Sequence, residues 1–152
     1  MSVDIRPIAY NDRLFAPLLA EAEAGNGAFL LRLRDEWLSG ALRFEGEGEI
    51  LVGAFDGEDL VGVAGISHDP YAPAQGLGRV RHVYVLQARR GRSVGRLLLQ
   101  ALIEHARGRF DTLRLSARDR AVATRLYESL GFVPCEDIKQ THRLVVATKM
   151  RG

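Results

Sequence analysis

The chain contains 152 residues, of which 47% are hydrophobic and 26% are charged, and its formal net charge is +2. This composition is typical of a soluble globular protein, and the length suits one domain that covers residues 1–152. No apolar run approaches the roughly 20 residues of a membrane helix, and the N-terminus lacks an apolar signal core, so we expect a cytoplasmic protein. Cys135 is the only cysteine, which excludes an internal disulfide and a metal site built from several thiolates.

The charges are distributed unevenly along the chain. Residues 1–60 carry twelve acidic and five basic side chains, a balance of −7, whereas residues 61–152 carry seven acidic and sixteen basic ones, a balance of +9. Residues 79–96 contain six arginines and no acidic residue. A bipolar chain of this kind can bind an anionic cofactor on one side and a cationic substrate on the other, although solvated surface accounts for the acidic half equally well.

Hydrophobic periodicity and turn residues divide the chain into alternating strands and helices. In chain order, the predicted elements are a strand at 3–6, a helix that Asp12 caps and Gly25 stops, a helix at 28–38, strands at 50–55, 60–67 and 78–86, a helix at 94–107, a strand at 112–116, a helix at 120–130, and strands beginning at 132 and spanning 142–150. A strand, a helix and a further strand follow one another around residue 94, and this order implies a parallel pair of strands.

Residues 83–99 form the segment with the clearest chemical signal. A β-branched and aromatic strand leads into a turn with Gly91 and Gly95, and apolar residues from Val94 onward then recur with the spacing of one helix face. The glycines allow the backbone to approach a ligand closely, and the first N–H groups of the helix have no intrahelical partner. Surrounding arginines add positive charge. We call residues 90–96 the glycine turn and predict that it binds a phosphate group.

The segment Arg90-Gly91-Arg92-Ser93-Val94-Gly95 resembles the acetyl-CoA motif of the GNAT superfamily of N-acetyltransferases, Gln/Arg-x-x-Gly-x-Gly/Ala, with Ser93 in place of the first motif glycine. A serine still presents its backbone N–H and can begin a helix. Downstream, Leu126-Tyr127-Glu128-Ser129-Leu130-Gly131-Phe132 resembles the family's "LYEKLGF" ending of the last helix. The resemblance covers nearly the whole chain. It implies an α/β (α+β) fold with a central mixed sheet of six to seven strands, about four flanking helices, and a splayed parallel pair at the cofactor site.

The resemblance also implies that acetyl-CoA is the co-substrate and that no metal takes part. Its pyrophosphate would lie against the glycine turn, at Arg90, Gly91, Arg92, Ser93, Val94, Gly95 and Arg96. The pantetheine would pair with the backbone of Val83, Tyr84 and Val85, where an N–H group can also stabilise an oxyanion. By resemblance, Tyr127 protonates the departing thiolate. Arg120 stands where the family often has an asparagine that contacts CoA.

An amine acceptor is mostly protonated at neutral pH and requires a base before it attacks. Some members of the family place a glutamate on the central strand, but this stretch of the chain contains no carboxylate. His82 has the most suitable intrinsic pKa, and a purely structural histidine is the alternative interpretation. A base that acts through ordered water, from Asp69 or from an acid among the first sixty residues, is the other option.

We therefore predict an N-acetyltransferase that transfers an acetyl group to a primary amine, of a small molecule or a peptide, by direct attack in a ternary complex. A non-catalytic sensor of acyl-CoA is the alternative. The acidic first sixty residues favour a cationic acceptor. We expect no membrane and no nucleic acid as partner, because the arginines surround a turn rather than one helix face. A homodimer is left open.

Overall fold

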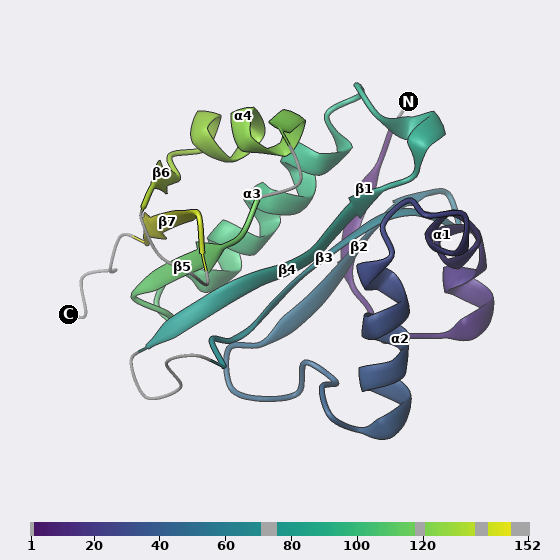
Figure 1. Cartoon of the computed structure of the whole chain (residues 1–152), viewed down its shortest axis with the longest axis horizontal. Helices are drawn as coiled ribbons and strands as arrows, with labels where there is room; N and C mark the ends of the chain where they lie inside the picture. Colours follow the sequence, from purple (N-terminus) through teal and green to yellow (C-terminus); the bar gives the residue numbers. More distant parts are fainter. Residues whose placement is uncertain (1, 71–75, 118–120, 136–139, 147–152) are drawn as a thin grey trace.

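The computed structural model describes residues 2–70, 76–117, 121–135 and 140–146 (Figure 1). Their elements, in order, are β1 (Asp4–Pro7), α1 (Asp12–Glu23), α2 (Phe29–Ser39), β2 (Ile50–Asp56), β3 (Asp59–His68), β4 (Leu77–Val85), a 3-10 turn η1 (Gln87–Arg89), α3 (Val94–Ala106), β5 (Thr112–Leu115), α4 (Ala121–Ser129), β6 (Val133–Pro134) and β7 (His142–Val145). Arg120 and residues 147–150, which the sequence assigns to a helix and a strand, lie outside the described residues. Within those residues, no helix is both long enough and apolar enough to cross a membrane.

The strands form one sheet in the order β1-β2-β3-β4-β5-β7-β6. Neighbouring strands are antiparallel except for β4 and β5, which run parallel because α3 connects them across one face. This arrangement confirms the predicted mixed sheet of six to seven strands, the four helices and the position of the parallel pair. The sequence did not predict the 3-10 turn η1.

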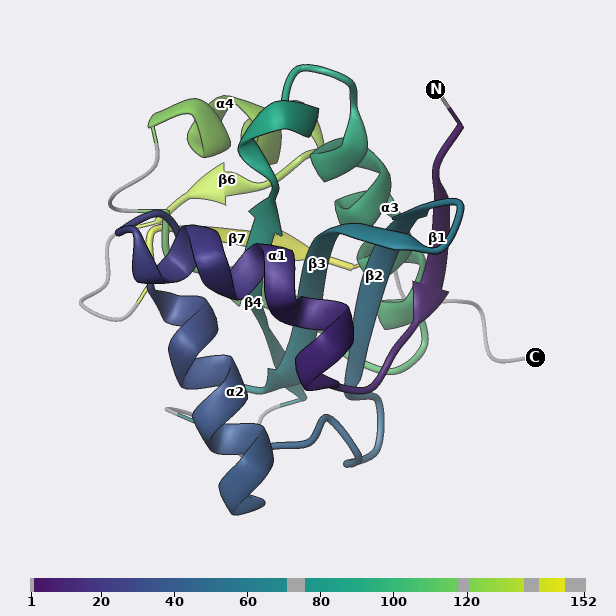
Figure 2. The same cartoon turned by 90° about the vertical axis from the view of Figure 1, so that its right-hand side faces the viewer.

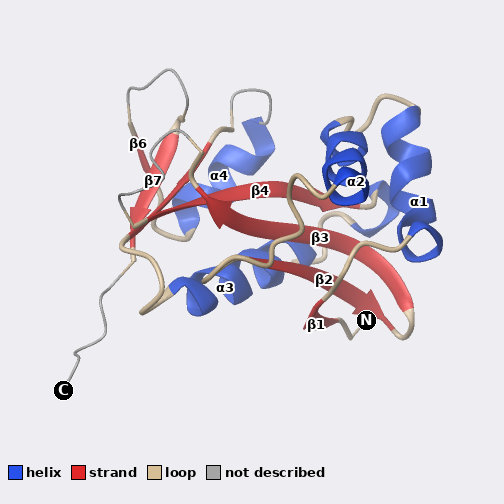
Figure 3. Cartoon of the chain, turned by 90° about the horizontal axis from the view of Figure 1, so that it is seen from below, coloured by secondary structure: helices blue, strands red, loops and turns tan. Residues whose placement is uncertain are grey.

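Helices cover both faces of the sheet. α1 and α2 lie on one face and α3 lies on the other, as Figures 2 and 3 show from two directions. One apolar cluster joins α1 and α2 to β2, β3 and the end of β4 through side chains such as Phe15, Leu33, Val63 and Tyr84. A second cluster joins α3 to the opposite face. α1 and α2 are displaced toward β2–β4, away from β5–β7 (Figure 3).

The N-terminus of α1 differs from the sequence prediction by one residue. Asn11, not Asp12, is the N-cap, and its side-chain oxygen accepts a hydrogen bond from the Leu14 backbone N–H at 2.9 Å. Asn11 has the extended backbone that a capping residue requires, while Asp12 already belongs to the first helical turn. Both residue types cap helices well, so composition alone could not distinguish them. The carboxylate of Asp12 is instead favoured by the positive end of the helix dipole.

A bulge interrupts β4 at His82. Val63 of β3 pairs with Tyr84 and Gly65 pairs with Arg81, so two residue steps on β3 face three on β4. The extra residue, His82, has a φ of 59°, in the left-handed region that non-glycine residues rarely adopt. The bulge also breaks the alternation of side chains along the strand. Arg81, His82 and Tyr84 consequently all contact side chains of α1 or α2, which lie on one face.

The parallel strands separate soon after they meet. β4 pairs with β5 only through Leu77, Gly78 and Arg79, although β4 continues to Val85. From residue 80 onward, β4 has no ladder partner on this side among the described strands. Backbone groups of β4 are therefore open to another molecule, and this edge is the splayed pair that the sequence predicted.

Candidate active site

A cleft of about 1190 Å³ follows the open edge of β4 from the glycine turn to α2. All the predicted site residues line it except Arg92, whose side chain is exposed outside it. Several further parts of its wall were not among the predicted site residues, including Gly27, Phe29, Arg32 and Arg79. The cleft has the size and the mixed apolar and polar lining that are typical of a small-molecule site.

The side chain of Arg90 turns back onto the end of β4. Its Nε donates a hydrogen bond to the Val85 carbonyl oxygen at 2.9 Å, and its guanidinium carbon lies 5.1 Å from the centre of the Tyr84 ring. Arg90 thereby satisfies a carbonyl group that the strand end leaves open. Gly91 follows with a φ of 79°, and no atom lies within 4 Å of the position of a Cβ. The backbone of the glycine turn is accordingly accessible from the cleft.

Ser93 begins α3 in an unusual conformation. Its φ is 66° and its ψ is 13°, and its hydroxyl makes no capping hydrogen bond to the helix. Ser93 stands at the start of α3, but its hydroxyl does not cap the helix, because a left-handed residue does not direct its side chain at the next N–H groups as an extended cap does. A glycine adopts the same backbone without the clash of a Cβ, which explains the motif glycine that Ser93 replaces. The first N–H groups of α3 remain available to a ligand.

α4 packs against the beginning of α3 and forms the other wall of the cleft. A Cβ at Gly95 would lie 3.2 Å from a methyl carbon of Leu126, so only glycine allows this approach without adjustment. Arg96 donates a hydrogen bond to the Ser129 hydroxyl at 2.8 Å. These contacts hold Tyr127 in the wall. Its ring is 6% exposed and meets Phe132 edge to face, with 5.7 Å between the ring centres.

Tyr84 connects the cleft to α1. Its hydroxyl donates a hydrogen bond of 2.6 Å to Glu21, whose carboxylate also accepts from the Gln87 N–H at 3.2 Å. Burial, followed by the hydrogen bond to Glu21, raises the pKa of the Tyr84 hydroxyl. A Cβ at Gly27 would lie only 2.5 Å from the Tyr84 ring, so the segment between α1 and α2 must pass here as glycine. Tyr84 is thus anchored by its side chain, and its predicted contact with a ligand is limited to its backbone.

His82 lies in the cleft wall between aromatic rings. It is 8% exposed, stacks on Phe29 with 6.1 Å between ring centres, and meets Phe44 edge to face at 6.3 Å. Its Nε2 has no hydrogen-bond partner within the described part of the chain. Burial lowers the pKa of His82 to about 3, and the charges of Arg81 and Arg32 add to this effect. The imidazole is therefore neutral at physiological pH, with an available acceptor nitrogen.

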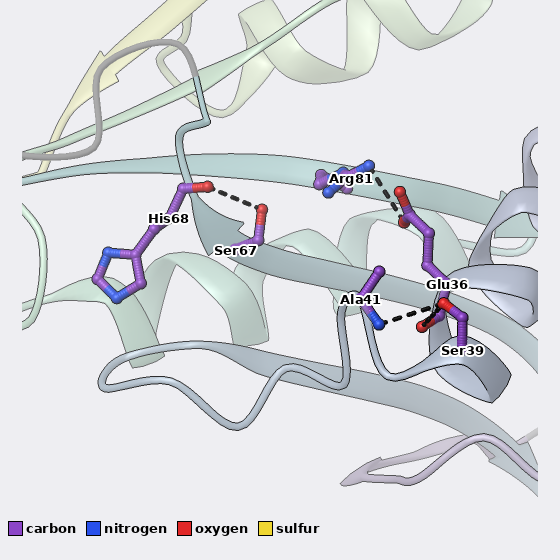
Figure 4. A network of polar contacts seen from close by, with 6 residues as sticks. All are labelled: Glu36, Ser39, Ala41, Ser67, His68 and Arg81. Atoms are coloured by element: carbon purple, nitrogen blue, oxygen red, sulfur yellow. Dashed lines mark hydrogen bonds and ion pairs between the residues drawn. The ribbon is translucent and has the colours of Figure 1, made fainter.

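The described lining of the cleft contains no aspartate and no glutamate. Asp69 lies outside it, buried 3.7 Å from Arg114, and Glu36 meets Arg81 at 3.5 Å (Figure 4). The two alternatives to His82 as a base were Asp69 and an acid of the first sixty residues. Neither places a carboxylate in the described lining of the cleft. The described wall also gives no support to a cationic acceptor, because none of the acidic residues among residues 1–60 lines it.

Nor do three or more histidine, cysteine, aspartate or glutamate side chains come close enough in the described ranges to form a metal-binding group.

Comparison with known proteins agrees with this geometry. Residues 13–132 match the model of the acetyltransferase (GNAT) family. A candidate acetyltransferase from Exiguobacterium sp. 255-15 is 28% identical, with 95% of this chain and 94% of that chain covered and a TM-score of 0.79. The ribosomal-protein-alanine N-acetyltransferase of Brucella melitensis is 25% identical, with 93% and 96% covered and a TM-score of 0.67. A GNAT-family acetyltransferase from Streptococcus pneumoniae, 19% identical, has the same fold over 96% of this chain and 100% of its own, with a TM-score of 0.70.

The fold and the cleft define an enzyme of the acetyltransferase class. The family match spans well over half of the residues, and the chain belongs to the acetyltransferase (GNAT) family.

Proposed function

We propose that the protein transfers an acetyl group from acetyl-CoA to a primary amine by direct attack in a ternary complex. The observation that carries the proposal is the continuity of the cleft, which runs from the glycine turn along the open edge of β4 to the buried imidazole of His82. Both substrates fit in one channel, so the amine can reach the thioester without an acyl-enzyme. The described lining supports this route, because Nε2 of His82 has no hydrogen-bond partner there and so activates neither of the two serines of the lining, Ser93 and Ser116.

The donor would be held mainly by backbone groups. The first N–H groups of α3 and the accessible backbone at Gly91 suit a pyrophosphate, and Arg96 adds positive charge beside them. The open edge of β4 at residues 83–85 suits the amide groups of pantetheine. Arg90 would contribute indirectly, by holding the end of β4 in place, because its guanidinium donates a hydrogen bond to the Val85 carbonyl oxygen.

The reaction forms a nitrogen–carbon bond to the acetyl group and breaks the carbon–sulfur bond. The nitrogen of the ammonium loses two protons, one before it attacks and one as the amide forms, and one proton is released to solvent overall. We propose the neutral His82 as the acceptor of the proton that leaves before attack. Its pKa near 3 makes it a weak base in the free enzyme, so solvent must carry the proton onward rapidly. The departing thiolate gains a proton, for which we propose the Tyr127 hydroxyl in the opposite wall. The products are an acetamide and free CoA.

A thiol-release assay with acetyl-CoA tests this proposal against a panel of polyamines, amino acids, aminoglycosides and peptides. We expect turnover with at least one amine, and initial rates that give intersecting double-reciprocal lines, as a ternary complex requires. Parallel lines with a trapped acyl-enzyme would overturn the direct mechanism. Calorimetry with CoA alone is the independent control, since binding without turnover on any amine would indicate a sensor.

A further inference from the structure

Three arginines line the cleft at the end away from the glycine turn. Arg79 and Arg81 project from β4, and Arg32 projects from α2. We call Arg32, Arg79 and Arg81 the basic wall. Arg79 lies six residues before Val85, which corresponds to roughly 20 Å along a strand. The basic wall is therefore separate from the arginines beside the glycine turn, and a pyrophosphate bound at that turn does not reach it.

Strand register continues this positive charge beyond the cleft. Arg79 of β4 is aligned with Arg114 of β5, which is aligned with Arg143 of β7. Residues aligned across neighbouring strands share one face of the sheet, and here it is the face on which α1 and α2 lie. Among the described elements, these two helices pack on the β2–β4 part of that face, whereas Arg114 and Arg143 belong to β5 and β7 beyond it. Arg114 pairs with buried Asp69 at 3.7 Å, so the charge of this row is partly compensated.

The basic wall surrounds the proposed point of reaction. Arg81 is the neighbour of His82 in the bulge, and the charges of both Arg81 and Arg32 act on the imidazole. Arg81 is only 17% exposed, and Glu36 holds it from α2 at 3.5 Å (Figure 4). Phe29 supplies an apolar surface against the same histidine. A protonated amine that carries no other charge would meet repulsion here, whereas guanidinium groups bind carboxylates and phosphates with paired hydrogen bonds.

Resting on the proposed function, we infer that the acceptor is a small amine carrying an anionic group, a carboxylate or a phosphate, which the basic wall binds while the amine faces His82. His82 lies three residues after Arg79, or roughly 10 Å along a strand, so a molecule of amino-acid size spans the gap. The bound anion would also oppose the arginine charges at His82, which makes the imidazole a better proton acceptor when the correct substrate is present.

Matched amines test the inference in the thiol-release assay. The set is 4-aminobutyrate, 3-aminopropyl phosphate, 4-aminobutanamide and 1,4-diaminobutane, together with α-amino acids and their amides. We expect an anionic member to exceed its neutral counterpart at least tenfold in kcat/KM, with an advantage that shrinks as salt increases. The carboxylate and phosphate arms distinguish the two anions. Equal or greater activity with the amides or the diamine would overturn the inference while leaving the acetyltransferase proposal intact.

Binding gives a second readout that does not depend on turnover. With CoA present, N-acetylated amino acids should bind at least tenfold more tightly than their amides in calorimetry. No preference would overturn the inference even for an enzyme with a slow acceptor. If CoA itself does not bind, the proposed function fails, and the inference fails with it.

Arg32→Gln assigns the effect to the basic wall. Arg32 is exposed and has no hydrogen bond or ion pair to another described residue, so its loss should leave the fold unchanged. We expect KM for the anionic acceptor to rise about tenfold, while kcat does not fall and KM for acetyl-CoA changes less than twofold. Arg13→Gln is the matched control, an exposed arginine of α1 outside the cleft. Arg81→Gln is the second variant. Equal KM values in Arg32→Gln, Arg81→Gln and the control would overturn the inference.

Discussion

The two ends of the cleft are built from different lengths of sequence. The glycine turn is one continuous segment, and its backbone provides most of what a ligand would contact. The basic wall joins α2 to β4, and its side chains come from positions 47 residues or more apart in the chain, Arg32 and Arg79. Local sequence can specify a backbone conformation, whereas a wall of side chains exists only after the helices pack on the sheet. The first end therefore has a motif, and the second has none.

The largest expected effect tests whether the glycine-turn end also contains catalytic chemistry. Tyr127→Phe removes the hydroxyl and keeps the ring that packs on Phe132. If the hydroxyl protonates the departing thiolate, kcat should fall by about 100-fold, within the usual range for a general acid. KM for acetyl-CoA should change much less. Tyr10→Phe, which alters another buried tyrosine outside the cleft, is the control. An unchanged kcat in Tyr127→Phe would show that Tyr127 contributes packing alone and donates no proton.

The second effect concerns His82 at the other end. Its pKa in the folded state is about 3, well below the ordinary value near 6.5, so the unfolded chain binds a proton that the folded chain rejects between these values. The contribution of His82 to the free energy of unfolding is fully present above about pH 6.5 and is lost as pH falls toward 3. Between pH 7 and pH 5 the loss should be about 2 kcal/mol.

His82→Asn should remove this part of the pH dependence, because asparagine tolerates a positive φ and does not titrate. Chemical denaturation at several pH values measures the free energy of unfolding for both proteins. The variant will be less stable at neutral pH, since it loses the contacts with Phe29 and Phe44. The comparison therefore uses the slopes, and parallel curves would contradict the buried, neutral imidazole.

The third effect tests the backbone at the glycine turn. Gly95→Asp places a side chain and a negative charge beside the first N–H groups of α3, so affinity for CoA should fall at least tenfold, or about 1.4 kcal/mol. Gly95→Ala is the control for crowding alone, because the Cβ that it adds would lie 3.2 Å from Leu126. Calorimetry on the folded variants separates the two contributions. Equal affinity for CoA in Gly95→Asp and the original protein would show that the phosphate does not bind at this turn.

The smallest effect compares two residues with the same backbone conformation. Ser93→Gly should stabilise the protein by about 0.5 kcal/mol, because relief of left-handed strain is partly offset by the greater freedom of glycine in the unfolded chain. Gly91→Ser is the reverse change in open space, and it should destabilise by about 1 kcal/mol. Thermal melting measures both. Shifts of the same sign would show that backbone strain does not control this turn.

What the sequence predicted, and what it missed, follows from the range of the interactions concerned. β4, the glycine turn and α3 were predictable because their periodicity and glycines act within a few residues. The bulge at His82 was not, since it depends on how β4 pairs with β3, and strand alternation alone would place His82 on the face opposite Arg81. The charge balance of residues 1–60 suggested a cationic acceptor, but a sum over a segment carries no direction. Glu21 and Glu36 instead pair with Tyr84 and Arg81.

The bulge in β4 bears on how an enzyme of this shape can change its substrate over generations. A one-residue deletion at His82 would restore alternation and shift the strand beyond it, which would displace Val85 from the carbonyl contact that holds Arg90 and the glycine turn. A point substitution at Arg32 changes an exposed side chain and leaves that register untouched. Acceptor preference can therefore change by single substitutions while the donor end stays fixed. Length changes in this strand would disrupt donor binding and acceptor binding together.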